Sequence, residues 1–299
     1  MGVLVASVGG DFVARVSGLD LSKPLDDGAF AQVRDAFHHY AVLVFPEQRI
    51  SDDQQIAFSE RFGPLEVSIR KDRPRRIANP RVSDISNVDE RDRVFDPDDE
   101  RAIYNAGNRL WHSDSSFKRV PAMASLLSGR EVPPEGGETE YADLRAAWDA
   151  LPADRKRGLD ELVAEHSFVY SRGLIGYDQF TDAERAEVPP VPQAVVRTHP
   201  ATGRKSLYVG SHASHVIGRP VEESRALLRE LLDFATQPQF VYRHAWRQHD
   251  LVMWDNRCVL HRGRLWDSAR YERVMHRTTV AGDSATADPS YVHELATRS

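Results

Sequence analysis

The chain has 299 residues, of which 41% are hydrophobic and 28% are charged, and its formal net charge is −6. This composition is typical of a globular protein with a substantial core, and the modest negative charge gives no basis for binding nucleic acid or a membrane surface. With a single cysteine, no signal-peptide pattern and no apolar stretch near the roughly 18 residues of a membrane span, we expect a cytoplasmic protein.

The first part of the chain predicts alternating strands and helices. Apolar and small residues alternate on both sides of a Gly-Gly turn, which is typical of an antiparallel strand pair. Two acidic residues then precede a stretch with helical spacing, and Ser51 with Gln54 fits a helix-capping box. The predicted elements are a strand pair over 3–17, a helix that follows Asp26-Asp27 and carries Phe30, Val33, Phe37 and Tyr40, a strand over 42–45 and a helix over 51–62.

Three segments lack long periodicity. Residues 68–80 are basic and interrupted by proline, which favours a solvated loop over a nucleic-acid site because no aromatic residues are interleaved. Residues 89–103 are highly charged and are predicted to be a flexible loop. Residues 171–193 contain glycine and paired-proline interruptions and are predicted to be an excursion near the mouth of a site, of a kind that often forms lids; lid behaviour itself stays open.

The remaining elements complete a single domain, 1–299, that is mainly β with flanking helices. No repeat or clear linker divides the chain. Strands are predicted over 122–127, 139–142, 195–199, 206–209, 240–246, 251–254 and 270–280, and helices over 144–151, 152–166 and 220–235.

The stretch Asn108–Phe117 carries the first candidate for metal binding. His112 and Asp114 are two residues apart, so in an extended strand their side chains would point to the same face. A third ligand must come from elsewhere. The best source is His261, which follows an apolar run and a turn-like Asp-Asn pair.

Two histidines and one carboxylate can form the facial triad of a non-haem Fe(II) site, which leaves positions open for substrate and oxygen. The same three ligands could hold Zn²⁺ around a water molecule. A non-catalytic binding protein is a third alternative.

Two arginines close to the predicted third ligand favour an anion-binding pocket. On the predicted strand 270–280, Arg273 and Arg277 would lie on one face. Two buried guanidinium groups are costly unless anions pair with them, and their planar geometry suits carboxylates. This favours two separate carboxylates near one metal.

The whole set of motifs resembles the taurine dioxygenase/TfdA family of Fe(II)- and 2-oxoglutarate-dependent dioxygenases. The motifs lie in order along the chain: His112-x-Asp114, Gly136-Gly137-Glu138-Thr139, Met253-Trp254-Asp255-Asn256-Arg257, His261 and Arg273-x-x-His276-Arg277. Several segments are most similar to the members that oxidise 2,4-dichlorophenoxyacetate and related aryloxyalkanoates.

The resemblance implies a double-stranded β-helix, or jelly-roll, core with the iron at one end. His112, Asp114 and His261 would be both the metal ligands and the catalytic residues. Arg273 and Thr139 would bind the distal carboxylate of 2-oxoglutarate, and O2 would be the oxidant. Arg277 would bind an anionic organic substrate, and the products would include succinate and CO2.

The resemblance leaves the substrate open. An aryloxyalkanoate cleaved to a phenol is the first expectation, and a taurine-like sulfonate or an alkyl sulfate is the alternative. Asn108, Ser116 and Lys71 are weaker substrate-binding candidates. Four further histidines could line the site or act as solvated or supporting residues, and the second role is favoured for His199, His212, His215 and His244. A homo-oligomer is compatible with the sequence, which does not decide the oligomeric state.

Overall fold

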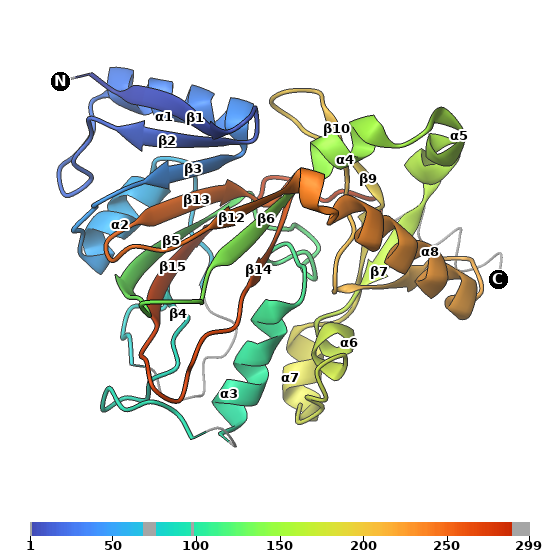
Figure 1. The fold of residues 1–299 in the computed structure, drawn as a ribbon. Coiled ribbons are helices and arrows are strands. Elements are labelled where there is room, and N and C mark those ends of the chain that lie inside the picture. The colour runs from blue at the N-terminus through green and yellow to red at the C-terminus, as the bar shows by residue number, and fades with distance from the viewer. Residues whose placement is uncertain (1, 68–75, 97–98, 289–299) are drawn as a thin grey trace.

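A computed structural model describes residues 2–67, 76–96 and 99–288 (Figure 1). The fold mixes helix and sheet, and its largest element is a seven-stranded sheet. Its strands, in their order across the sheet, are β1 (Leu4–Gly9), β2 (Val13–Ser17), β3 (Val42–Phe45), β13 (Leu251–Asp255), β5 (Ala124–Glu131), β15 (Val274–Val280) and β4 (Ser83–Asp84).

Three smaller sheets and a set of mostly short helices complete the fold. The sheets are β12 (Val241–His244), β6 (Thr139–Asp143) and β14 (Val259–Gly263); β11 (Ala213–Val216), β7 (Val163–His166) and β8 (Val191–Ala194); and β10 (Lys205–Leu207) with β9 (Val196–Thr198). The α-helices are α1 (Asp27–Tyr40), α2 (Asp52–Glu60), α3 (Glu100–Asn105), α4 (Leu144–Ala150), α5 (Ala153–Lys156), α6 (Phe168–Gly173), α7 (Asp182–Glu187) and α8 (Val221–Ala235). Short 3₁₀ helices cover Ala106–Arg109, Leu159–Glu161 and Pro238–Phe240.

The seven-stranded sheet is buried on both faces at its centre. In β13, Leu251 and Met253 pack into the cluster under α1 and α2, while Val252 and Trp254 pack into a second cluster on the opposite face. This alternation follows from the two-residue period of a strand. The second cluster also contains Tyr141 of β6 and Val259 of β14, so the β12-β6-β14 sheet packs against that face.

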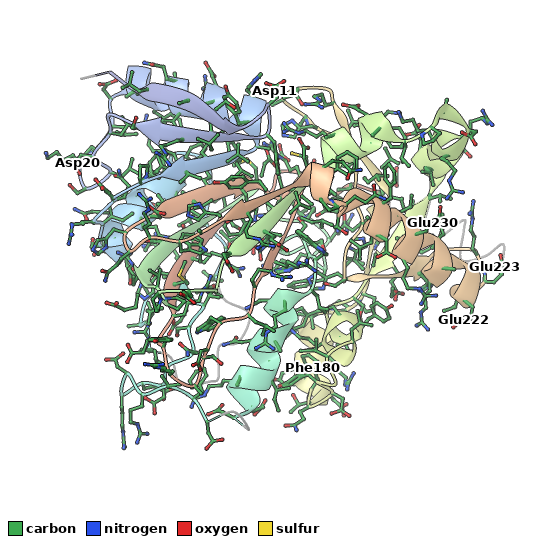
Figure 2. The ribbon with its side chains drawn as sticks, in the orientation of Figure 1. Asp11, Asp20, Phe180, Glu222, Glu223 and Glu230 are labelled. Atoms are coloured by element: carbon green, nitrogen blue, oxygen red, sulfur yellow. The ribbon has the colours of Figure 1, made fainter. Side chains whose placement is uncertain are left out.

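The amphipathic pattern of residues 220–235 predicted the longest described helix, α8, correctly. Leu228 and Leu231 of α8 are buried in the cluster shared with α4. Glu222, Glu223 and Glu230 lie on its exposed side and project away from the sheets (Figure 2). Burial of one face stabilises such a helix more than intrinsic propensity does.

Most of the predicted elements are confirmed. The strand pair at the N-terminus, α1, β3, α4, the β9-β10 hairpin and α8 lie where the sequence placed them. The capping box of Ser51 and Gln54 is present, although α2 ends at Glu60.

Other predictions were wrong in position or type. The loop predicted over 89–103 gives way at Glu100 to α3, and residues 171–193 include α7 and β8. The helix predicted over 152–166 is instead a short helix, a 3₁₀ turn and β7. These elements are too short to show a helical or strand period in the sequence. With the added helices, the fold is more evenly mixed between helix and sheet than the predicted mainly β class. Within the described residues, the four sheets do not join into one closed barrel, and no described helix is long and apolar enough to cross a membrane.

Candidate active site

His112 and His261 are joined through their backbones. The N–H of His112 donates to the carbonyl of His261 at 3.1 Å, and the N–H of His261 donates to the carbonyl of His112 at 2.8 Å. This is an isolated bridge, so the predicted strand at His112 was wrong. The chain turns immediately afterwards, where Ser115 adopts a left-handed φ of 56° and donates its hydroxyl to Glu66 at 2.7 Å.

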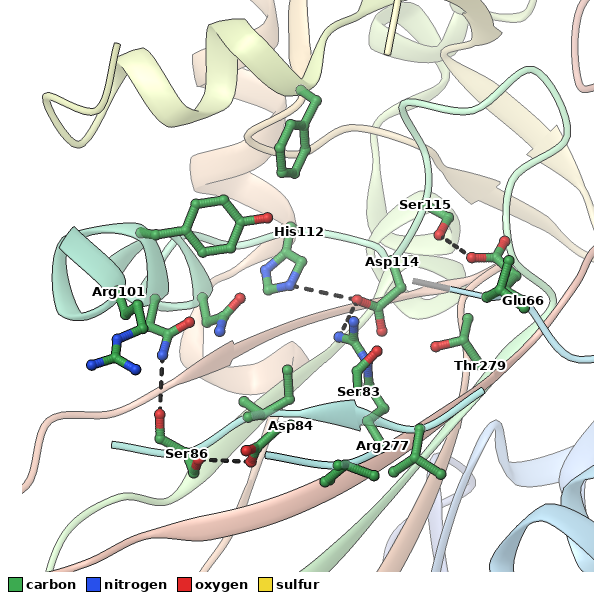
Figure 3. Close-up of a pocket in the computed structure, with 18 of the residues that line it drawn as sticks. Glu66, Ser83, Asp84, Ser86, Arg101, His112, Asp114, Ser115, Arg277 and Thr279 are labelled. Carbon is green, nitrogen blue, oxygen red and sulfur yellow. Dashed lines mark hydrogen bonds and ion pairs between the residues drawn. The ribbon is translucent and has the colours of Figure 1, made fainter. Parts of the chain in front are cut away.

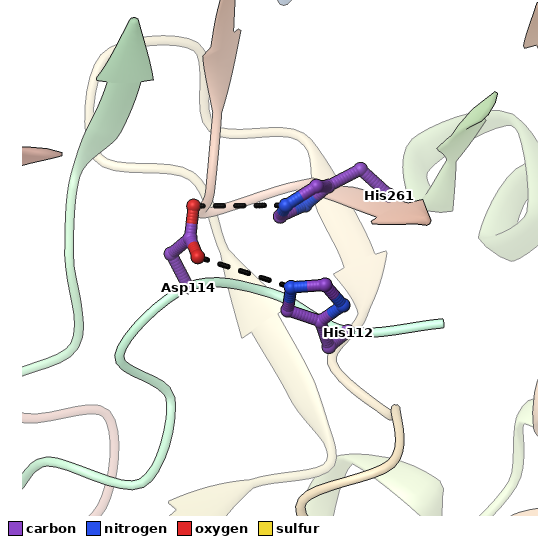
Figure 4. A group of neighbouring side chains, drawn as sticks. All are labelled: His112, Asp114 and His261. Atoms are coloured by element: carbon purple, nitrogen blue, oxygen red, sulfur yellow. Dashed lines mark ion pairs between the residues drawn. The ribbon is translucent and has the colours of Figure 1, made fainter. Parts of the chain in front are cut away.

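The turn brings Asp114 to both histidines. His112 Nε2 lies 3.9 Å from Asp114 Oδ1, and His261 Nε2 lies 3.7 Å from Asp114 Oδ2 (Figure 4). One ligand atom from each of the three residues falls within 4.8 Å of the others, and all three residues are buried. The geometry therefore brings together the three residues predicted to bind metal.

The protonation of these groups also fits a metal. The carbonyl of Leu110 lies 2.7 Å from His112 Nδ1, and because a carbonyl can only accept, Nδ1 must carry the proton. The lone pair of Nε2 is then directed toward Asp114. Burial lowers the pKa of both His112 and His261, which keeps the rings neutral. Burial by itself would raise the pKa of Asp114. The charge of Arg277, together with the two histidines and the hydrogen bond from Ser125, outweighs burial and holds that pKa below its usual value.

Arg277 contacts the carboxylate directly. Its NH1 donates to Asp114 Oδ1 at 2.6 Å, and its side chain also lines the cavity above the site. The second predicted anion-binding arginine therefore touches a predicted metal ligand, which the sequence did not indicate.

Arg273 is buried and forms no ion pair with any described residue. It precedes β15 rather than lying within it, and its Nε donates to the carbonyl of Gly137 at 3.1 Å. Burial lowers the pKa of Arg273 to about 10. A buried cation without a carboxylate partner is costly, so the geometry suits an anionic ligand.

The predicted partner Thr139 is the first residue of β6, two residues after Gly137. Its hydroxyl accepts a hydrogen bond from Trp246 Nε1 at 3.0 Å, which leaves its proton for a ligand. Tyr141, on the same face of β6, has a buried hydroxyl with no hydrogen-bond partner among the described residues. The sequence did not single out Tyr141, although its position two residues after Thr139 was a usable signal.

A cavity of about 300 Å³ lies beside His112 and Asp114 (Figure 3). His112, Asp114 and Arg277 form one part of its lining, and Asn108 lines it as predicted. Ser116 is not one of the lining residues, because its hydroxyl is turned to His166 Nδ1 at 3.1 Å. Lys71 lies outside the described residues.

Aromatic side chains form another part of the cavity wall. The rings of Phe117 and Phe168 are 4.6 Å apart, and that of Tyr104 lies 6.2 Å from Phe168. The guanidinium of Arg172 lies 4.7 Å from the ring centres of both Tyr104 and Phe168. All four side chains line the cavity. Their convergence could not be predicted from the sequence because they come from separate segments.

The four histidines of open role separate clearly. His199 bonds to Asp255 at 2.9 Å and His244 to Asp250 at 3.1 Å, while His215 is half-buried beside Ser214. His212, by contrast, lines the cavity 6.2 Å from the ring of His112. The supporting role favoured for all four histidines therefore does not fit the position of His212.

The chain matches, over residues 5–279, the model of the family described as taurine catabolism dioxygenase TauD, TfdA family. It is 49% identical over 276 residues to an α-ketoglutarate-dependent 2,4-dichlorophenoxyacetate dioxygenase of Cupriavidus pinatubonensis, covering 91% of this chain and 96% of that protein. An (S)-phenoxypropionate/α-ketoglutarate-dioxygenase of Sphingobium herbicidovorans is 40% identical over 288 residues, covering 94% and 96%. The crystal structure of AAD-2 in complex with Mn(II) and N-oxalylglycine is similar with a TM-score of 0.89 and 46% identity, covering 96% of this chain and 100% of that one.

Proposed function

The chain belongs to the TauD/TfdA dioxygenase family, and we propose that its substrate is an aryloxyalkanoate, a carboxylate joined to an aromatic ring through an ether oxygen. As an α-ketoglutarate-dependent dioxygenase it uses Fe(II), 2-oxoglutarate and O2. This membership overturns the zinc-hydrolase and non-catalytic alternatives. When bound, Fe(II) with 2-oxoglutarate activates O2 to hydroxylate a C–H bond while succinate and CO2 are released.

We assign Fe(II) to His112 Nε2, Asp114 and His261. The donor set is the one that non-haem iron oxygenases use. The backbone bridge between the two histidines holds their rings 4.2 Å apart, so the backbone itself places these two ligands side by side.

Arg273 and the hydroxyl of Thr139 would bind the distal carboxylate of 2-oxoglutarate. The buried guanidinium is stabilised by that anion, and the Thr139 proton adds a second hydrogen bond. The Gly136-Gly137 turn permits this placement. Gly137 has φ +68°, and a Cβ there would lie 3.2 Å from Arg273 Nε.

Arg277 would orient the substrate carboxylate. Its guanidinium bridges the cavity and Asp114, so an anion bound to it would lie beside the metal ligands. The α-carbon of an aryloxyalkanoate is bonded to both the carboxylate and the ether oxygen. Hydroxylation there gives a hemiacetal, which breaks down to a phenol and a 2-oxo acid.

One observation carries the aryl assignment: the cavity that His112, Asp114 and Arg277 line is also lined by a wall of aromatic rings. Aromatic pairs gain about 0.5–1.5 kcal/mol beyond area burial, so Phe117, Phe168 and Tyr104 favour an aryl group over a short alkyl chain. A taurine-like sulfonate would satisfy Arg277 but would leave this wall uncovered.

We also propose that the seven-stranded sheet and the β12-β6-β14 sheet are the two faces of a jelly-roll core within a single domain. The apolar cluster between them supports this, since it combines side chains of both sheets. The family model spans residues 5–279, which supports one domain over most of the chain.

The test is a substrate panel of aryloxyacetates, aryloxypropionates, alkyl sulfates and taurine, with Fe(II) and 2-oxoglutarate. We expect phenol and succinate in equal amounts from the aryloxy acids, and little phenol from their uncharged esters. Succinate formation with sulfonates but not with aryloxy acids would contradict the substrate assignment. Equal phenol release from ester and acid would contradict the role of Arg277.

A further inference from the structure

The carboxylate of Asp114 is held by a chain of hydrogen bonds that begins outside the triad. Ser125 of β5 donates its hydroxyl to Asp114 Oδ2 at 2.7 Å, and Asn256 Nδ2 donates to that Ser125 oxygen at 2.9 Å. We propose that Ser125 and Asn256 are positioning residues that fix the orientation of this carboxylate at the metal. The proposal rests on the proposed function, in which Asp114 is a metal ligand.

The direction of each hydrogen bond follows from groups that can only donate. Asn256 Oδ1 lies 3.1 Å from the backbone N–H of Asp114 and 3.0 Å from the indole N–H of Trp254. Because both partners are donors, this atom must be the amide oxygen, and the amide NH2 must face Ser125. Ser125 therefore accepts from Asn256 and has its single proton left for Asp114.

The two oxygens of Asp114 consequently have different partners. Oδ2 accepts from Ser125, and Oδ1 accepts from Arg277 at 2.6 Å. Held at both ends, the carboxylate cannot rotate about its Cβ–Cγ bond without breaking a charge-assisted hydrogen bond. The carboxylate would therefore meet a bound metal in one fixed orientation.

Burial makes the chain of hydrogen bonds effective. Ser125, Asn256 and Trp254 have no exposed surface, and Asp114 is 5% exposed. Water does not compete for these groups, and hydrogen bonds in such an environment are stronger than in water.

Asn256 also links the loop that carries Asp114 to the hairpin that carries His261. It lies in the turn between β13 and β14, and β14 carries His261. Its backbone carbonyl accepts the hydroxyl of Ser113 at 2.6 Å, so the loop that carries Asp114 is attached to this turn at two points.

The test compares Ser125→Ala with a matched control, Ser128→Ala. Ser128 is on the same strand and equally buried, but its hydroxyl has no hydrogen-bond partner among the described residues. Anaerobic titration with Mn(II), followed by electron paramagnetic resonance, measures metal affinity without turnover. Loss of a contact that orients a metal ligand typically weakens binding about 10–100-fold, and we expect this for Ser125→Ala only.

Two further measurements separate positioning from folding. Ser125→Thr keeps the hydroxyl and should restore the Mn(II) affinity and spectrum. Ser125→Ala should also release succinate in excess of oxidised substrate, because a misplaced metal ligand uncouples the two half-reactions. Circular dichroism should show the wild-type fold in both Ser125→Ala and Ser128→Ala, although Ser125→Ala should unfold at a lower temperature because it leaves two buried hydrogen-bond partners unsatisfied.

The outcomes distinguish this inference from the proposed function. If Ser125→Ala binds Mn(II) with the affinity and spectrum of the wild type, the positioning role is wrong while the proposed function stands. If the wild type oxidises no aryloxy acid but Ser125→Ala still loses metal affinity, the substrate assignment fails and the positioning role is retained.

Discussion

The metal end and the aromatic end of the cavity are built in different ways. At the metal end, a two-way backbone bridge and short hydrogen bonds fix His112, His261 and Asp114. At the aromatic end, side-chain packing between α3, α6 and the turn at Phe117 forms the wall. From this difference we expect that backbone contacts hold the metal ligands in place, whereas side-chain packing determines which substrate fits. Substitutions in the aromatic wall should therefore change substrate choice with little effect on metal affinity.

The largest effect should follow from removing a metal ligand. Asp114→Ala, His112→Ala or His261→Ala should each abolish turnover, because two ligands cannot hold Fe(II) in a defined geometry. Succinate release measures the activity, and circular dichroism checks that the fold is intact. Robust activity in any one variant would remove that residue from the triad.

A smaller but specific effect is expected for the co-substrate. Arg273→Ala should raise the 2-oxoglutarate concentration for half-maximal activity at least about tenfold, since losing a buried charge pair costs about 2–5 kcal/mol and 1.4 kcal/mol is a factor of ten. Steady-state kinetics at saturating substrate measure this change. A change confined to the KM for the aryloxy acid would show that the roles of Arg273 and Arg277 are reversed.

The aromatic end can be altered alone at Gly107. A Cβ there would overlap Nη1 of Arg172, so Gly107→Ala must displace that guanidinium from between Tyr104 and Phe168. Overpacking costs about 1–3 kcal/mol, and we expect kcat/KM for an aryloxy acid to fall about tenfold. Mn(II) affinity should be unchanged.

Gly173→Ala is the matched control for this change, because a Cβ at Gly173 meets nothing within 4 Å. If kcat/KM falls equally in the two variants, the position of the Arg172 guanidinium does not matter for substrate binding. A matching loss of Mn(II) affinity in Gly107→Ala would show that the two ends of the cavity are coupled.

The smallest effect concerns stability and involves His166, which lies behind the cavity wall. Burial lowers the pKa of His166 to about 3, while an unfolded histidine has its ordinary value of 6.5. Between these two pH values the unfolded chain binds a proton at His166 that the folded chain does not bind. The contribution of His166 to the free energy of unfolding is therefore complete above pH 6.5 and is lost as the pH falls toward 3. The slope for one proton is at most about 1.4 kcal/mol per pH unit.

Urea unfolding of the metal-free protein at pH 7 and pH 5 measures this dependence. The free energy of unfolding should fall less between the two pH values in His166→Gln than in the wild type. If the free energy of unfolding falls by the same amount between pH 7 and pH 5 in the wild type and in His166→Gln, His166 is not the source of this pH dependence.

The sequence predicted the metal end better than the aromatic end. His112-x-Asp114 and His261 stood out because few residue types bind metals and their order matched a family motif, although the predicted strand at His112 proved to be a bridge and a turn. Asn256 lay within that motif without an assigned role, since its function depends on contacts with Ser125 that spacing does not show.

The aromatic end could not be predicted for a different reason. Tyr104, Phe117 and Phe168 converge only through tertiary packing, and α3 and α6 each have six residues, too few for a clear helical period. The strand β15 was predicted to begin at residue 270 but begins at Val274, so Arg273 was placed inside the strand although it lies immediately before it.

The bridge between His112 and His261 has a consequence for how the protein acquires its metal. Residues from the middle and the C-terminal part of the chain must meet before the centre exists, and contacts of such long sequence separation form late in folding because loop closure costs entropy. A nascent chain therefore has no complete iron site until β14 has left the ribosome and paired with β6. Iron would accordingly stabilise the finished fold rather than guide its assembly.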